Sequence, residues 1–322
     1  AQIMKNMGFK IQGSDLNKNK NISSCNKSGI KTFIGHSAKN VFKATILVKS
    51  TAIKNNNIEI KYAKKNKIPI YTRAEVLADV VSLKKNIIIT GSHGKTTTTS
   101  LIAKILTDQR LDPTIINGGV INSFKSNAKL GKGDWAILEA DESDGSFLKL
   151  PINYSVVTNI DYEHVEYYKS YKNLKQSFVD FINKTPTTGK AIICLDNSDI
   201  KKILNKIKNK NIITYGENKN ADYKISKIKY NYESTSFNLS FQDKLKKIKI
   251  IKNINVKLLG RHNALNAAAA FIVCINLGIN QNIAKKSLKN FSGVQRRMTK
   301  VFSKNKNDFY DDYAHHPTEI SS

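Results

Sequence analysis

The chain has 322 residues, with 53 Lys and Arg against 25 Asp and Glu, a formal net charge of +28, and 40% hydrophobic residues. This length suffices for about two or three domains with packed cores, at roughly 100–200 residues per domain. Apolar residues are plentiful, whereas the chain holds only 16 glycines and 5 prolines, so a disordered or collagen-like chain is excluded. The longest apolar run, residues 267–275, is far shorter than the roughly 18 residues of a membrane span.

The cysteines and lysines exclude further classes of protein. Cys25, Cys194 and Cys274 are widely spaced and odd in number, which excludes a disulfide framework and a zinc knuckle and predicts a cytoplasmic protein. The lysines are scattered among Asn and Ile, as a biased codon pool would also produce. We therefore favour solvated lysine faces over a groove for a phosphate backbone, and expect neither a nucleic-acid nor a membrane partner.

Residues 1–83 alternate between helix and strand patterns. A helix ends near Met7, a strand covers residues 9–12, a turn follows at residues 13–16, a second strand covers 44–50, and a helix covers 55–66. This pattern predicts half of a doubly wound α/β sheet. Because no strand and no glycine-rich turn precede the first helix, we expect the chain to be truncated at its N-terminus.

From residue 84 the α/β pattern is stronger. Buried strands at 86–90, 134–140, 154–160 and 189–196 alternate with helices at 96–109 and 171–185, which predicts a parallel sheet covered on both faces. Residues 222–258 alternate with period two and predict antiparallel hairpins, and a helix covers 262–278. Residues 294–304 and 308–320 predict the first two strands of a third α/β unit, so the expected domains are 1–83, 84–293 and 294–322.

A phosphate loop is predicted between strand 86–90 and the helix after it. The sequence GSHGKTTTTS gives Gly91, Ser92, His93, Gly94, Lys95, Thr96 and Thr97 as nucleotide-binding candidates. Glycines let backbone N–H groups face an anion, a lysine reaches terminal phosphates, and the Thr96 hydroxyl is placed for magnesium. The loop is shortened, since Ile89 stands where the first glycine of the usual motif would be. An ordinary glycine-rich turn is the alternative.

Acidic residues follow the next two strands. Glu139, Asp141, Glu142 and Asp144 come at the end of strand 134–140, and Glu163 and His164 follow strand 154–160. Carboxyl ends of parallel strands meet at one edge, so these groups can reach a metal beside Thr96. A solvated acidic turn, and a structural role for His164, are the alternatives.

Three further motifs lie towards the C-terminus. Asn263, Asn266 and His262 open a helix, where amides can read an adenine edge and Arg261 can contact a phosphate, although a plain helix cap is equally compatible. Arg297 is suited to bidentate phosphate contact. Asp312, His315 and His316 follow a strand and suit a ribose hydroxyl and a second substrate.

Taken in order, GSHGKTTTT, EADESDGSF, TNIDYEHVEYY, GRHNALNA, FSGVQRRM and DDYAHHPTEI resemble the Mur ligase family of peptidoglycan synthesis. Within that family, EADESD with DDYAHHPTE is most similar to the members that add L-alanine to UDP-N-acetylmuramate. Ser143 stands where the tripeptide recycling ligases usually carry a tyrosine. The resemblance covers essentially the whole chain.

The resemblance implies an α/β protein with a Rossmann-like UDP-muramate-binding domain, a central phosphate-loop ATPase domain with a parallel and a small antiparallel sheet, and the start of an amino-acid-binding domain. It implies ATP and Mg²⁺, with an acyl phosphate as intermediate. Lys95, His164, Arg297 and His315 would be catalytic, and Thr96, Glu139 and His164 would hold magnesium. Asn266 and His262 would meet adenine, Asp312 ribose, His315 and His316 the acyl phosphate and alanine, and His93 and Ser143 the muramate.

The chain also departs from the family pattern. The opening glycine-rich turn is missing, leaving only Gly13, Ser14 and Asp15 of a later turn, the third domain stops early, and Met298 replaces an aromatic residue. We therefore expect a fragment that does not ligate. The alternatives are a tripeptide recycling ligase, a non-catalytic nucleotide-binding module and a folylpolyglutamate synthase-like ligase. The sequence leaves the oligomeric state and the number of metal ions open.

Overall fold

The computed structural model describes residues 1–305 and 307–321, and its chain divides into two compact units. Unit 1 is Ala1–Leu83 with Lys149–Pro151, and unit 2 is Lys84–Leu148 with Ile152–Ser322. Residues 294–321 group with unit 2 and do not form a compact unit of their own.

Unit 1 contains two separate parallel sheets of two strands each. β1 pairs with β2 and β3 with β4. The elements are α1 Gln2–Asn6, β1 Gln12–Asp15, α2 Lys20–Lys27, β2 Lys31–Ile34, η1 Ala38–Val41, β3 Leu47–Lys49, α3 Ile58–Lys65, β4 Ile70–Thr72 and α4 Arg73–Val81.

The first predicted strand and turn were wrong. The strand is Gln12–Asp15, so Gly13, Ser14 and Asp15 lie in β1 and not in a turn. Parallel pairing with β2, Gly13 opposite Thr32 and Asp15 opposite Ile34, overrides the weak strand preference of Gly, Ser and Asp. We expected the strands of unit 1 to form half of one doubly wound sheet. The described strands form two separate sheets instead.

Unit 2 is built on one ten-stranded sheet with the order β14-β13-β12-β11-β10-β9-β5-β8-β6-β7. The seven strands from β12 to β6 in this order pair in parallel with one another. At the two edges the pairing is antiparallel, between β12 and β13, between β13 and β14, and between β6 and β7. The antiparallel hairpins expected at residues 222–258 are present and are appended to the parallel sheet at β11. The strands are β5 Lys85–Thr90, β6 Thr114–Ile121, β7 Ser126–Lys129, β8 Trp135–Glu139, β9 Tyr154–Val157, β10 Lys190–Cys194, β11 Ile212–Gly216, β12 Tyr223–Tyr230, β13 Thr235–Gln242 and β14 Ile248–Val256.

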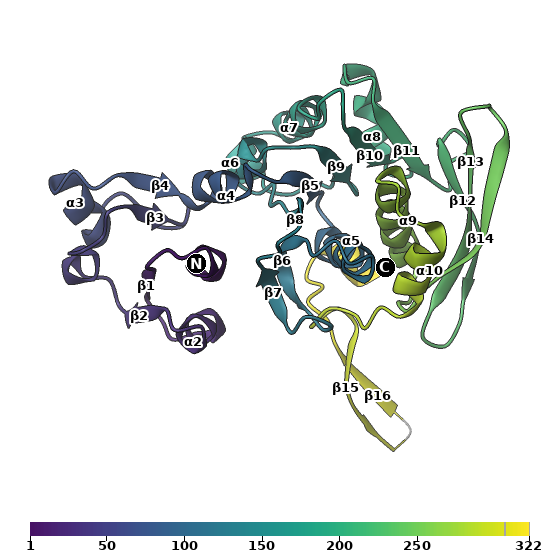
Figure 1. Ribbon diagram of the computed structural model, residues 1–322. Helices are drawn as coiled ribbons and strands as arrows, with labels where there is room; N and C mark the ends of the chain where they lie inside the picture. Colours follow the sequence, from purple (N-terminus) through teal and green to yellow (C-terminus); the bar gives the residue numbers. More distant parts are fainter. Residues whose placement is uncertain (306, 322) are drawn as a thin grey trace. The chain divides into compact units, whose positions relative to one another are not determined.

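Helices cover both faces of this sheet. Figure 1 shows α7 and α8 on one side of the parallel strands and α5, α9 and α10 on the other. β5 is buried from Asn86 to Thr90, as expected for a parallel strand between two helical layers. The helices are α5 Lys95–Asp108, η2 Ser146–Lys149, α6 Val165–Tyr168, α7 Tyr171–Asn183, α8 Ser198–Ile203, η3 Leu204–Lys206, α9 Arg261–Asn276 and α10 Gln281–Lys289.

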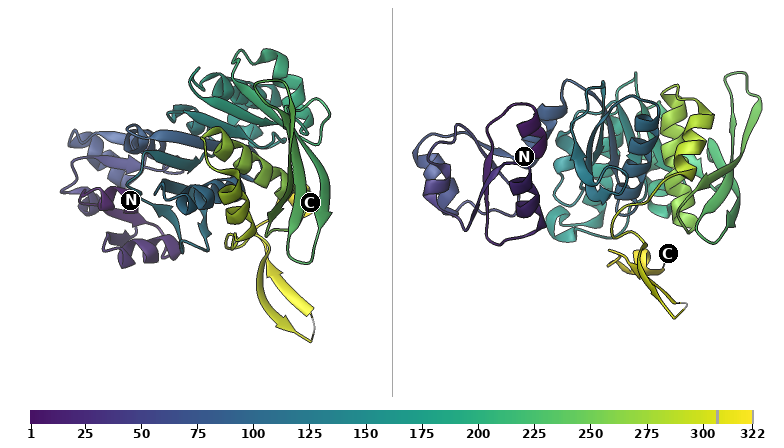
Figure 2. Two further views of the ribbon diagram at one scale, coloured as in Figure 1. Left: turned by 45° about the vertical axis from the view of Figure 1, so that its right-hand side comes forward. Right: turned by 60° about the horizontal axis from the view of Figure 1, so that its bottom comes forward.

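Residues 294–321 form a hairpin and a short helix. β15 Thr299–Lys304 pairs antiparallel with β16 Asn307–Asp311, and α11 is Pro317–Ser321. Figure 2 shows the hairpin projecting away from the ten-stranded sheet. Both predicted strands are present, although each is shorter than expected. Residues 307–321 are called the C-terminal segment below.

Several elements of unit 2 were not predicted. The β6–β7 hairpin contains Gly118 and Gly119, and β11 is preceded by the polar run Lys208–Asn211, so neither shows a clear strand pattern. Short helices α8 and α10 were also missed. Both begin at an asparagine whose side-chain oxygen accepts backbone N–H groups, Asn197 and Asn280, which is a helix-start signal.

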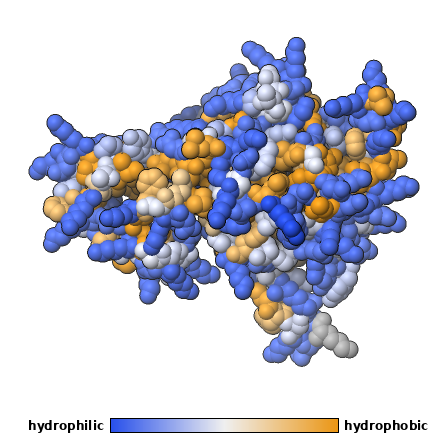
Figure 3. Space-filling model, in the orientation of Figure 1, coloured by the Kyte–Doolittle hydropathy of each residue, from blue (hydrophilic) through white to orange (hydrophobic). Residues whose placement is uncertain are grey.

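Hydrophilic residues dominate the face shown in Figure 3, with groups of apolar residues between them. The three cysteines are free, and Cys194 and Cys274 are buried. Among the described residues, no helix has both the length and the hydropathy of a membrane span.

The core of unit 2 depends on close packing between α5 and α9. Ala267 to Ala270 of α9 have no exposed surface, and neither do Leu101 and Ile102 of α5. Alanine lets two helices approach closely, because it adds almost no volume between the backbones. A larger side chain in this run has no space to enter.

We predict that Ala268→Leu lowers the free energy of unfolding of unit 2 by about 1–3 kcal/mol through overpacking. Lys286→Leu adds the same side chain at an exposed position of α10. It is expected to change the free energy of unfolding by less than about 0.5 kcal/mol. Urea unfolding followed by the fluorescence of Trp135, the single tryptophan, measures both. Equal stability of the two variants would contradict the packing argument.

Candidate active site

The predicted phosphate loop is Gly91–Gly94, between β5 and α5. Gly91 has φ +130° and Gly94 φ +83°, and such positive φ values favour glycine. A Cβ on Gly91 would lie 2.3 Å from Thr158 Oγ1 and 2.9 Å from the Asn159 carbonyl oxygen. The loop therefore needs glycine at this position for two reasons, backbone conformation and close approach to the end of β9.

Hydrogen bonds from the segment after β9 fix the loop. Asn159 Oδ1 accepts from the His93 backbone N–H at 2.8 Å, and Thr158 Oγ1 donates to the His93 carbonyl at 2.6 Å. The Asp161 backbone N–H donates to Ser92 Oγ at 2.8 Å. Backbone and side chains of two adjacent strand ends thus hold the loop in one conformation.

Lys95 begins α5 and faces both the loop and a buried carboxylate. Its Nζ donates to the Gly91 carbonyl at 2.6 Å, to the Ser92 carbonyl at 3.2 Å and to Glu142 Oε1 at 3.0 Å. The Glu142 side chain is 1% exposed. The ammonium group is therefore placed at the loop and neutralised by an acidic residue from the segment after β8.

Thr96 and Glu139, two of the three predicted magnesium ligands, are in contact. Thr96 Oγ1 donates to Glu139 Oε1 at 3.0 Å, and the Gly118 backbone N–H donates to Glu139 Oε2 at 2.6 Å. Thr97 is buried in the first turn of the same helix. Strand β8 delivers Glu139 beside β5 because the two strands pair in parallel, Ile89 opposite Glu139.

His164, the third predicted ligand, lies among carboxylates. Its Nε2 is 3.7 Å from Glu142 Oε1 and 3.5 Å from Glu163 Oε2. Asp141, Glu142 and His164 offer ligand atoms within 4.8 Å of one another. The Glu142 carboxylate raises the pKa of His164, against an opposing effect of burial. Its role as a magnesium ligand stays a prediction.

The beginning of α9 adjoins the phosphate-loop helix. Asn266 Oδ1 accepts from Thr98 Oγ1 at 3.3 Å, and a Cβ on Gly94 would lie 2.5 Å from the same Oδ1. Asn266 Nδ2 donates to Asn263 Oδ1 at 3.3 Å, and Asn263 Nδ2 is 3.0 Å from His262 Nε2. These three residues are therefore connected, and no side chain caps α9, whose N-cap is Gly260.

The Arg261 side chain forms ion pairs with two carboxylates. Its Nε lies 2.5 Å from Glu217 Oε1 and its Nη2 3.0 Å from Asp196 Oδ2. The phosphate contact expected of this side chain is not favoured, because two carboxylates already bind its guanidinium group.

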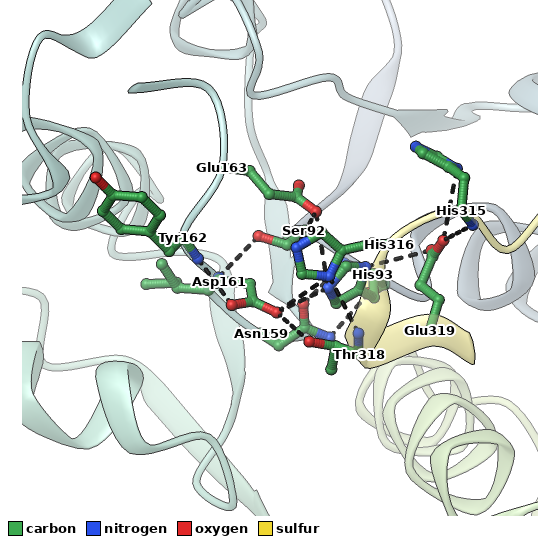
Figure 4. Close-up of polar contacts among 12 residues, drawn as sticks. Ser92, His93, Asn159, Asp161, Tyr162, Glu163, His315, His316, Thr318 and Glu319 are labelled. Carbon is green, nitrogen blue, oxygen red and sulfur yellow. Dashed lines mark hydrogen bonds and ion pairs between the residues drawn. The ribbon is translucent and has the colours of Figure 1, made fainter. Parts of the chain in front are cut away.

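The C-terminal segment crosses the phosphate loop (Figure 4). Glu319 Oε1 lies 3.2 Å from His93 Nδ1 and 3.8 Å from Arg297 Nη1. The ring centroids of His93 and His316 are 5.0 Å apart, and Thr318 Oγ1 donates to Asp161 Oδ2 at 2.8 Å. The structure thus places Arg297 and His316 close to residues that contact the loop, and their predicted roles toward phosphate and the second substrate stay predictions.

The remaining predicted residues lie in more exposed places. His315 is 73% exposed, with Nδ1 3.7 Å from Glu319 Oε2. Asp312 accepts backbone N–H groups of Met298 at 2.6 Å and Ala314 at 2.7 Å. The Ser143 backbone N–H donates to Asp141 Oδ1 at 2.9 Å. No contact described for these three places them against the phosphate loop.

Sequence reasoning missed four residues that hold the site together. Thr158, Asn159 and Asp161 fix the loop, and Glu319 joins it to the C-terminal segment. The signal was present, since all four lie within or directly beside the quoted motifs TNIDYEHVEYY and AHHPTEI. Thr158 and Asn159 are not typical ligands, whereas the carboxylates of Asp161 and Glu319 could have been singled out on their chemistry.

Comparison with known proteins agrees with this geometry. The Mur ligase middle domain matches residues 89–274, and the Mur ligase family catalytic domain matches residues 1–85. The UDP-N-acetylmuramate–L-alanine ligase of Pelagibacter ubique is 55% identical over 99% of this chain and 69% of its own length. The chain belongs to the Mur ligase family.

Other relatives extend the comparison. The enzyme of the same name from Rhodopseudomonas palustris is 42% identical over the whole chain and 69% of its own length. Among solved structures, UDP-N-acetylmuramate–alanine ligase MurC from Thermotoga maritima matches with a TM-score of 0.85 and 27% identity, covering 98% of this chain and 71% of that one. A murein peptide ligase from Psychrobacter arcticus shares the fold, with a TM-score of 0.82 and 23% identity over 99% and 71%.

We predict that Gly94→Ala weakens ATP binding at least tenfold. The new Cβ would collide with Asn266, and the alanine backbone would have to adopt a disfavoured positive φ. Gly278→Ala is a matched control, since Gly278 has φ +82° and nothing within 4 Å of its Cβ position. Both variants carry about 1–2 kcal/mol of backbone strain, but only the first distorts the site. Calorimetric titration with ATP measures the affinity, and equal affinities would disprove the argument.

We also predict a pH dependence at His164. Its pKa is raised, so its contribution to stability is complete below the unfolded value of about 6.5 and is lost as pH rises through the folded value. NMR titration of the metal-free protein, assigned with His164→Gln, should give a midpoint above 6.5. Glu142→Gln should lower this midpoint, and an unchanged midpoint would exclude Glu142 as the cause.

Proposed function

We propose that this chain binds ATP and has the function of the ligases that join L-alanine to the carboxylate of UDP-N-acetylmuramate in peptidoglycan precursor synthesis. The expectation that the chain by itself does not ligate stays a prediction. The observation that carries the proposal is the 55% identity, over 99% of the chain, with a ligase of that name. The geometry of the phosphate loop, with Lys95 at its mouth and Thr96 on Glu139, supports an ATP-dependent reaction. The expected cytoplasmic location stays a prediction.

The reaction proceeds in two steps. A muramate carboxylate oxygen attacks the γ-phosphorus of ATP, the bond from that phosphorus to ADP breaks, and an acyl phosphate forms. The amine of L-alanine then attacks the acyl carbon, and the tetrahedral intermediate expels inorganic phosphate while the nitrogen loses a proton. Both steps build negative charge on oxygen, so positioned cations and N–H groups lower the barriers.

The cations of the site fit the transferred phosphoryl group. Lys95 lies at the mouth of the loop, and the N-terminus of α5 directs backbone N–H groups to the same place. Arg297 is linked to His93 of the loop through Glu319. Exchange of Lys95 from Glu142 to a phosphate oxygen would leave that buried carboxylate facing His164 Nε2, 3.7 Å away.

Thr96 and Glu139 fit a magnesium ion. Their oxygens already meet at 3.0 Å, and Mg²⁺ prefers hydroxyl, carboxylate and phosphate oxygens. We assign His164 as the third protein ligand, although imidazole is a less usual partner for this ion. When bound, magnesium neutralises charge on the β- and γ-phosphates.

The other assignments follow the family resemblance. Asn266, Asn263 and His262 would meet adenine at the start of α9, and Asp312 the ribose. His315 and His316 would face the acyl phosphate and alanine, and His93 and Ser143 the muramate. Support is strongest for Asn266, which touches the phosphate-loop helix through Thr98.

A tripeptide recycling ligase is the second candidate, because the Psychrobacter arcticus murein peptide ligase has nearly the same fold. The sequence favours alanine, since Ser143 replaces the tyrosine usual in recycling ligases. Supplying L-alanine and the tripeptide in separate assays with ATP, Mg²⁺ and UDP-N-acetylmuramate decides between them.

We predict that phosphate release by the complete gene product requires both UDP-N-acetylmuramate and L-alanine. Lys95→Ala should reduce the rate about 100-fold or more, the size of effect seen when one charge-stabilising group is removed. Lys104→Ala is the control, since Lys104 lies on the same helix and pairs with Asp108, and it should retain the parent rate. Release that needs only the tripeptide would support the recycling ligase.

A further inference from the structure

A second group of metal-ligating side chains lies where the C-terminal segment crosses the phosphate loop (Figure 4). His93, Glu163 and His316 each offer one ligand atom, and these atoms lie within 4.8 Å of one another. The side chains are 15%, 18% and 25% exposed. We propose that these three residues form a zinc site, separate from the Thr96–Glu139 pair assigned to magnesium.

The two imidazoles converge on one carboxylate oxygen. Glu163 Oε1 lies 3.9 Å from His93 Nε2 and 3.6 Å from His316 Nε2. Tetrahedral zinc, with bonds of about 2.0–2.1 Å, places its ligand atoms roughly 3.3 Å apart. The two separations from Glu163 Oε1 exceed that spacing by about 0.6 and 0.3 Å, and every separation among the three ligand atoms is at most 4.8 Å. Side-chain rotations of up to about 1.5 Å would therefore bring the three atoms to the spacing of tetrahedral zinc.

The other ring nitrogens face carboxylates of their own. His93 Nδ1 lies 3.2 Å from Glu319 Oε1, and His316 Nδ1 lies 3.7 Å from Asp161 Oδ2. Histidines that bind metal commonly direct the second nitrogen at a carboxylate, which fixes the ring and increases its basicity. This arrangement occurs here at both histidines and is independent of the convergence on Glu163.

The surroundings of Asp161 are consistent with metal binding. Asp161 Oδ2 lies 3.1 Å from His93 Nε2 and also accepts from Thr318 Oγ1 at 2.8 Å. A zinc ion at His93 Nε2 exchanges the first contact for a metal bond, and Asp161 keeps Thr318 and His316. The carboxylate is then available to the ion as a fourth ligand.

The donor set selects the class of metal. Two imidazoles and one carboxylate suit zinc and similar transition metals, whereas Mg²⁺ prefers oxygen ligands alone. Two neutral imidazoles and Glu163 leave one positive charge on the zinc complex. The neighbouring carboxylates of Asp161 and Glu319 compensate for that charge.

Zinc at this site joins two distant parts of the chain. His93 belongs to the phosphate loop, two residues before Lys95, and His316 belongs to the C-terminal segment. A bound ion would hold that segment on the loop in place of the weaker contacts between His93, Glu319 and Asp161. The proposal concerns binding of the metal itself and does not depend on the ligase reaction.

The test is a zinc titration of the whole chain in competition with a chromophoric chelator, with millimolar Mg²⁺ present and no nucleotide. We expect one zinc ion per chain, bound at least tenfold more weakly by His316→Gln. His315→Gln is the matched control, because His315 is adjacent in sequence and lies outside the trio. It should bind zinc as the parent does.

Two further variants keep the outcome decisive. His316→Cys supplies another zinc ligand and should restore the affinity lost in His316→Gln, which a merely structural effect would not do. His164→Gln should leave zinc binding unchanged. The proposal is overturned if His316→Gln binds zinc like the parent, or if His164→Gln abolishes binding and so places the ion among Asp141, Glu142 and His164.

Discussion

The close approach of the phosphate loop to the end of β9 determines where the other polar groups of the site lie. Gly91 leaves no space for a Cβ against Thr158 and Asn159, so the ends of β5 and β9 are locked together. The same contact places Asp161 and Glu163 beside His93. Lys95 and Thr96 follow at fixed positions because α5 begins directly after the loop. A single backbone contact therefore organises ligands from four separate segments.

The site is acidic although the chain carries a net charge of +28. Five carboxylates lie at the loop or at its first helical turn, through contacts with Thr96, Lys95, His93 or His316. They belong to Glu139, Glu142, Asp161, Glu163 and Glu319. A triphosphate entering this region meets like charges as well as Lys95 and Arg297. A cation that shields the carboxylates would therefore favour nucleotide binding, which supports the proposed magnesium ion.

Much of this arrangement could be predicted from local sequence. The alternation of buried strands and helices from residue 84 onward identified the parallel sheet, and strand ends identified Lys95, Thr96 and Glu139. Their contacts follow from the register of parallel strands, which places residues at equal depth. Unit 1 was harder, because Gly13, Ser14 and Asp15 form a strand only through pairing with β2. The contact between Glu319 and His93 spans more than 200 residues and has no local signature, and neither has the burial of Glu142.

The packing of α5 against α9 has a consequence for synthesis of the chain. Thr98 and Asn266 are bonded side chain to side chain across 168 residues of sequence. At roughly 5–20 residues per second on the ribosome, α5 waits on the order of ten seconds or more before α9 has been made. Leu101 and Ile102, fully buried in the finished protein, lack their partner throughout that time. The nucleotide site is therefore assembled late, and the half-made chain is the form most dependent on protection from aggregation.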